Sequence, residues 1–175
     1  MKNFMNDFGK PIIVLMCICL VMSAALAFTN DVTAPIIEKA AAEKAEAARM
    51  EVLPDADAFT EVTADGLPAG ITAVYKANNG AGFVFMMEAK GYGGTMSLIC
   101  GIDADGKIVA TKTLSHAETS GLGSKTADEP FRSQFVGKDA ALDGVDTITG
   151  ATISSKAYIG AVNEAFAAYE MVKGA

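Results

Sequence analysis

The stretch that decides the fold is residues 94–115, GTMSLICGIDADGKIVATKTLS. Apolar residues occupy every second position from Met96 to Ile102, which is the period of a β-strand that buries one face. The Asp-Ala-Asp-Gly run at 103–106 is typical of a hairpin turn, and a second β-prone run follows it. Two neighbouring antiparallel strands are therefore predicted, with Cys100 as a small buried apolar residue.

Further strands are predicted before this hairpin, and helices after it. The runs ITAVYKA at 71–77 and GFVFMMEA at 82–89 alternate in the same way. Residues 129–140 predict a short helix and loop, and residues 155–173 predict an amphipathic helix that Gly174 can end. This order predicts an α+β fold, with one domain of antiparallel strands and packed helices. The core residues expected from the helical part are Phe131, Phe135, Tyr158, Ala161, Val162, Ala165, Tyr169 and Val172.

The N-terminal region predicts a single transmembrane helix. Residues 11–28 carry no charge, and at about 1.5 Å per residue they approach the ~30 Å of a hydrocarbon core. Lys2 and Lys10 precede this segment, so the positive-inside rule places residues 1–10 in the cytoplasm and the rest of the chain outside. A signal peptide is the alternative, because residues 25–27 match a small-x-small cleavage site. The length and hydrophobicity of the run favour a retained anchor.

A helical stalk is predicted between the anchor and the domain. Residues 29–54 are rich in Ala, Glu, Lys and Arg, which favour helix. Pro35 near the start and Pro54 after the end bracket one helix of roughly five turns. The extracytoplasmic domain is then expected over residues 55–175.

Composition excludes several classes of function. Fourteen basic and twenty-one acidic residues give a net charge of -7, which disfavours binding to nucleic acid. There is a single histidine, His116, and the three cysteines Cys17, Cys19 and Cys100 show no CxxC spacing. An intrinsic zinc or iron–sulfur site is therefore not expected.

Three motifs could carry chemistry. GYGG at 91–94 and ETSGLG at 118–123 are glycine-rich, and glycine lets a backbone approach a ligand closely. DTITGATISS at 146–155 contains five hydroxyl side chains just before the predicted C-terminal helix. By spacing alone, these hydroxyls are typical of a helix N-cap.

Taken together, the motifs resemble a known family. GYGG, a strand hairpin, HAETSGLG, FRSQF and D-x-x-T-G-A-T-x-x-S follow one another as in the FMN-binding domain of the Rnf and Nqr electron-transport complexes. The resemblance is closest to the G subunit of the Rnf complex, and it covers nearly the whole chain, including the anchor and stalk. The last motif is the specific one, because it is the family's flavinylation pattern.

The resemblance implies that the Thr152 hydroxyl carries FMN through a phosphoester bond. A separate flavin transferase that uses FAD and Mg²⁺ would attach it. The phosphodiester would face the N-terminus of a helix that begins near Ser154, with Ser154 or Ser155 as the cap. The implied cofactor-binding residues are Thr152, Asp146, Thr149, Gly150, Ala151 and Ser155 in the motif, and Glu118, Thr119, Gly121, Leu122 and Gly123 in the glycine-rich loop.

The sequence departs from the family at two positions. Ser120 stands where the family usually has Pro, which makes the loop less rigid. Thr149 stands where the family often has Ser, and this change keeps the hydroxyl.

The implied function is a one-electron relay in a membrane-bound, ion-translocating ferredoxin:NAD⁺ oxidoreductase. This subunit would be non-catalytic and would work with the other membrane and peripheral subunits of the complex. The C subunit of the Na⁺-translocating NADH:quinone reductase, usually a longer chain, is an alternative. A stand-alone extracytoplasmic flavoprotein and a non-redox, pilin-like protein are two others.

Overall fold

The computed structural model describes residues 9–64 and 66–174. It contains two compact units, Met1–Glu43 and Lys44–Ala175, and each is described by itself. Lys2 and most of the segment 1–10, expected in the cytoplasm, lie outside the described residues.

The first unit consists of a helix that continues into the second. This helix, α2, runs without a break over Lys10–Val52. Among the described residues it is the one helix long and apolar enough to cross a membrane, as expected of an anchor. Pro35 lies inside it, so the residues expected to form the anchor and most of the stalk are parts of one continuous helix. A proline removes one backbone donor but does not always end a helix.

The second unit is built on an antiparallel sheet. The strands, in spatial and sequence order, are β1 (Phe59–Glu61), β2 (Ile71–Ala77), β3 (Gly82–Lys90), β4 (Thr95–Asp103) and β5 (Ile108–His116). The four strands predicted by alternation and the turn at 103–106 are confirmed. The short edge strand β1 was not predicted, because three residues are too few to show a period.

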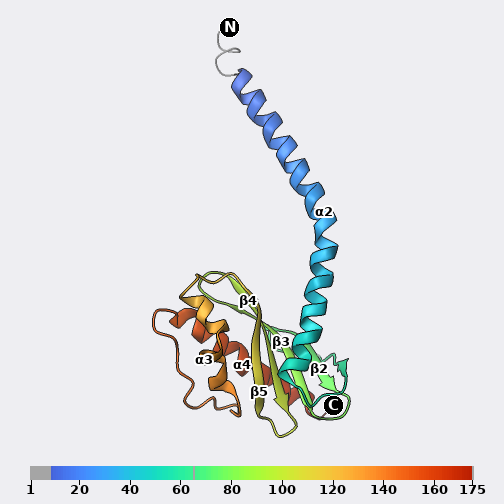
Figure 1. Ribbon diagram of the computed structural model, residues 1–175, viewed down its shortest axis with the longest axis vertical. Helices are drawn as coiled ribbons and strands as arrows, with labels where there is room; N and C mark the ends of the chain where they lie inside the picture. Colours follow the sequence, from blue (N-terminus) through green and yellow to red (C-terminus); the bar gives the residue numbers. More distant parts are fainter. Residues whose placement is uncertain (1–8, 65, 175) are drawn as a thin grey trace. The chain divides into compact units, whose positions relative to one another are not determined.

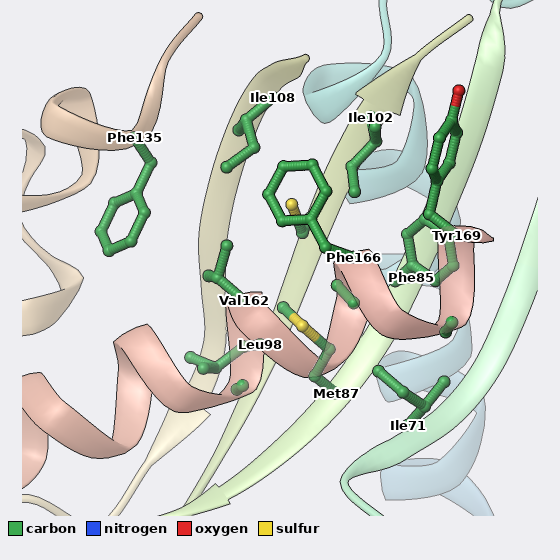
Figure 2. Close-up of a cluster of buried hydrophobic side chains, with 14 of the residues drawn as sticks. Ile71, Phe85, Met87, Leu98, Ile102, Ile108, Phe135, Val162, Phe166 and Tyr169 are labelled. Atoms are coloured by element: carbon green, nitrogen blue, oxygen red, sulfur yellow. The ribbon is translucent and has the colours of Figure 1, made fainter. Parts of the chain in front are cut away.

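Helical segments follow the sheet, and the predicted α+β class is confirmed. They are η2 (Gly123–Ala127), α3 (Glu129–Arg132), η3 (Ser133–Phe135) and α4 (Thr152–Val172). The α4 helix covers one face of the sheet (Figure 1). Figure 2 shows Val162, Phe166 and Tyr169 of α4 among side chains from the strands. Every core residue predicted from the helical part is buried.

The other face of the sheet packs against the last turns of α2. Ala48 and Val52 are buried there in one cluster with Val84 and Ile99. The Arg49 guanidinium lies 4.2 Å from the centre of the Tyr75 ring, which adds a cation–π contact. The compact unit therefore starts within α2, at Lys44.

The buried Tyr158 gives the domain a predicted sensitivity to alkaline pH. Burial raises the pKa of its hydroxyl from 10.0 to about 12. Thr111 and Thr113 are near enough to lower this pKa slightly, although neither hydroxyl has hydrogen-bond geometry. The folded state favours the neutral form of the Tyr158 phenol. The part of the folding stability that depends on this neutral form is complete below pH 10 and is lost as the pH rises towards 12.

We expect Tyr158→Phe to remove that sensitivity. Between about pH 9 and about pH 11, the wild-type free energy of unfolding should fall by about 1.4 kcal/mol more than that of the variant. Urea titrations at both pH values measure the difference, and the contribution of the buried Cys100 thiol cancels between the two proteins. Equal alkaline losses in both proteins would contradict the prediction.

Candidate functional site

The site is built around the turn that leads into α4. This helix begins at Thr152, and Ala151 occupies the N-cap position without any side-chain cap. The buried Ser155 hydroxyl donates to the Ala151 carbonyl oxygen at 2.9 Å and accepts from the Ile148 N–H at 3.1 Å. Ser155 therefore fixes the turn. Its expected role as the cap is wrong, because its hydroxyl bonds backwards to the fourth residue before it.

A buried carboxylate joins this turn to the two glycine-rich stretches. Glu118, 8% exposed, follows β5. Its Oε2 accepts a hydrogen bond from the Ser154 hydroxyl at 2.6 Å, and its Oε1 accepts one from the Gly93 N–H at 3.1 Å. The alternative expectation, that Ser154 caps α4, is therefore wrong as well. Glu118 ties the β3–β4 turn to the first turn of α4.

Two glycines allow this close packing. A Cβ atom on Gly123 would lie 2.1 Å from the Glu118 Oε2 atom, and one on Gly93 would lie 2.5 Å from the Ala117 carbonyl oxygen. Both distances are far below van der Waals contact. Glycine is thus required at both positions for the carboxylate to reach its partners.

These segments surround a cleft with a volume of 430 Å³. That volume lies within the range of small-molecule and cofactor sites. The lining residues that were predicted as site residues are Glu118, Thr119, Leu122, Gly123, Gly150, Ala151 and Thr152. Three further residues line the cleft and were not predicted, namely Tyr92, Ile153 and Ser154. The GYGG motif was the signal that could have identified Tyr92.

Four predicted site residues do not line the cleft. Asp146 and Thr149 are on the loop before α4, and the Asp146 N–H donates to Gln134 Oε1 at 2.8 Å. Gly121 has a φ of +77° and shapes the loop that carries Leu122. Ser155 is the fourth, and it lies beneath the turn.

The Thr152 hydroxyl is available for chemistry. Thr152 is exposed, and its side chain makes no hydrogen bond to any other described residue. It is the first residue of α4, where backbone N–H groups lack intrahelical acceptors. The location favours an anion at this hydroxyl.

Comparisons with known proteins agree with this geometry. The model of the FMN-binding domain family matches residues 91–167, which include every residue that lines the cleft. The G subunit of the proton-translocating ferredoxin:NAD⁺ oxidoreductase complex of Clostridium ljungdahlii is 31% identical, over 84% of this chain and 83% of its own. The G subunit of the ion-translocating oxidoreductase complex of Methanosarcina acetivorans is 33% identical, over 91% of this chain and 93% of its own. The chain belongs to the family of G subunits of ion-translocating oxidoreductase complexes.

One solved structure is also similar to this G subunit. The crystal structure of Shewanella oneidensis NqrC aligns with a TM-score of 0.48 and 22% identity, over 61% of this chain and 63% of that one. In this G subunit, the residues from Tyr92 to Ser154 that form the cleft all belong to its FMN-binding domain.

Glu118 is expected to be the most sensitive structural residue of the site. Glu118→Ala removes the acceptor of the Ser154 hydroxyl and the Gly93 N–H, and we expect a loss of about 1–3 kcal/mol in the free energy of unfolding. Glu88→Ala, at an exposed carboxylate on β3, is the matched control and should change stability by less than about 0.5 kcal/mol. Urea unfolding of the protein without FMN measures both. Equal effects would contradict the role of Glu118.

Proposed function

We propose that this subunit relays single electrons through FMN held covalently on Thr152. The observation that carries the proposal is the exposed Thr152 hydroxyl at the start of α4, on the wall of a cofactor-sized cleft. The D-x-x-T-G-A-T-x-x-S pattern places Thr152 at the attachment position of the family's flavinylation motif.

The residues present fit an FMN group. The Thr152 oxygen would hold the phosphoryl group, and the first backbone N–H groups of α4 would donate to its oxygens. The exposed apolar side chains of Tyr92, Leu122 and Ile153 line the cleft and suit an aromatic ring system. When bound, FMN supplies oxidation and reduction in one-electron steps.

Attachment would be a phosphoryl transfer carried out by a separate flavin transferase that uses FAD and Mg²⁺. The bond between the Thr152 oxygen and the FMN phosphorus forms, the pyrophosphate bond of FAD breaks, AMP leaves and the hydroxyl loses its proton. The exposure of Thr152 leaves the hydroxyl accessible to such an enzyme. A covalent bond would also keep the site loaded where free FMN is dilute.

We further propose that the domain lies outside the cytoplasm. Lys10 precedes the apolar part of α2, which favours a cytoplasmic N-terminus by the positive-inside rule. The partners would be the other membrane and peripheral subunits of an Rnf-type complex. In this arrangement the protein would hold FMN in position. Glu118 would hold the walls of the cleft together through its hydrogen bonds with Ser154 and Gly93.

The test is the intact mass of the full chain made with and without a flavin transferase. The expected result is a transferase-dependent gain of one FMN less one water, with flavin fluorescence that stays on the denatured chain in a gel. Peptide mapping should place the added mass on the peptide that contains Thr152. An unmodified chain from a transferase-competent host would overturn the proposal.

A further inference from the structure

The cleft has an uneven charge distribution. Among the residues that line it, Glu118 is the one carboxylate, and none is basic. A phosphodiester on Thr152 would add a second negative charge. The N-terminus of α4 offers only a partial positive charge, of about half an elementary charge. A nearby cation would therefore stabilise the loaded site.

Lys156 lies where such a cation is needed. It is exposed on α4, four residues after Thr152, and residues spaced by four lie on the same face of a helix. Helical side chains tilt towards the N-terminus, so the long Lys156 side chain can extend along the helix surface towards Thr152. The Cβ atoms of such a pair are about 5–6 Å apart.

Lys156 is also free to take a new partner. Within residues 9–64 and 66–174, its ammonium group has no ion pair and no hydrogen bond. Several other basic side chains of the domain have partners. Lys112 pairs with Glu51, and Lys138 donates to the Asp143 carbonyl oxygen at 2.6 Å.

We propose that Lys156 is the cation that pairs with the phosphodiester on Thr152. This inference rests on the proposed function, because it requires FMN to be attached there. The Lys156 ammonium group and the phosphodiester would meet on an exposed surface, in a charge-assisted contact. Dissolved salt would weaken this contact, because it screens exposed charges. It would attract the anionic FAD phosphates before transfer and hold the phosphodiester afterwards.

Another basic residue close in sequence to the cleft is Lys125, on η2, two residues after Gly123. Lys125 lines a different groove, together with Asp128, Phe131 and Ile148. It is exposed, like Lys156, and it lies in the same domain. Lys125 is therefore a matched control for the loss of one surface charge.

The first test measures the reactivity of the wild-type lysines towards an amine-acetylating reagent, by peptide mass spectrometry. Attachment of FMN, verified by intact mass, should slow the acetylation of Lys156 about threefold at low salt and leave Lys125 unchanged. In 1 M NaCl the protection should disappear. Protection that persists in high salt would indicate steric cover and overturn the inference, as would the absence of protection.

The second test follows the rate at which a flavin transferase loads the full chain. Lys156→Gln should slow loading about threefold at low salt and weaken its salt dependence, whereas Lys156→Arg and Lys125→Gln should load like wild type. Equal loading of Lys156→Gln at every salt concentration would overturn the inference and leave the proposed function intact. A wild-type chain that never gains FMN would overturn both.

Discussion

Thr152→Ala is expected to leave the fold intact and to stop electron flow through the complex. The wild-type side chain is exposed and makes no hydrogen bond within the described part of the chain, so stability should change by less than about 0.5 kcal/mol. The substitution nevertheless removes the oxygen that would carry FMN. The amount of covalent flavin should fall from one per chain to none. The coupled activity should fall to the level of a complex that lacks this subunit. In-gel flavin fluorescence and electron transfer in purified complexes measure the two losses.

Two further substitutions make this result specific. Thr152→Ser keeps a hydroxyl at the same position and should retain covalent FMN. Thr147→Ala removes another exposed hydroxyl from the same loop, at a position that the D-x-x-T-G-A-T-x-x-S pattern leaves free. It should load and function normally. Full coupled activity in Thr152→Ala, with the subunit present in the complex, would contradict the relay through this residue.

Gly101→Ala is expected to be strongly destabilising. Gly101 lies on β4, on the face against which α2 ends. A Cβ atom there would lie 2.2 Å from the Val52 carbonyl oxygen, and backbone cannot move aside as a flexible side chain can. We expect a loss of about 3 kcal/mol in the free energy of unfolding, because the end of α2 must separate from the sheet.

Gly160→Ala is the control for this prediction. A Cβ atom at Gly160 meets no atom within 4 Å, and the residue lies within α4. Alanine favours helix over glycine by about 1 kcal/mol, so this variant should be as stable as wild type or more so. Urea unfolding of the full chain in detergent compares the two. A Gly101→Ala variant as stable as Gly160→Ala would show that the end of α2 does not pack tightly on β4.

Local patterns in the sequence were sufficient for most of the fold. The alternation from Met96 to Ile102 and the stripe from Tyr158 to Val172 each show a period within one element, and both sets of residues are buried as predicted. The residues implied by the family resemblance include seven of the ten that line the cleft. The strands and α4 are encoded by neighbouring residues, because the periods of strand and helix depend only on backbone geometry.

The tertiary structure decided how the motifs meet. Nothing local indicates that Glu118 bonds both the Gly93 N–H and the Ser154 hydroxyl, because these partners are 25 and 36 residues away in the chain. Local sequence also gives no sign that Val52, at the end of α2, packs against Gly101 of β4. The sequence by itself determined the strands, the helix α4 and the D-x-x-T-G-A-T-x-x-S motif. Only long-range packing decided that the Ser154 hydroxyl binds the buried Glu118 carboxylate, while the Thr152 hydroxyl on the wall of the cleft has no hydrogen-bond partner among the described residues.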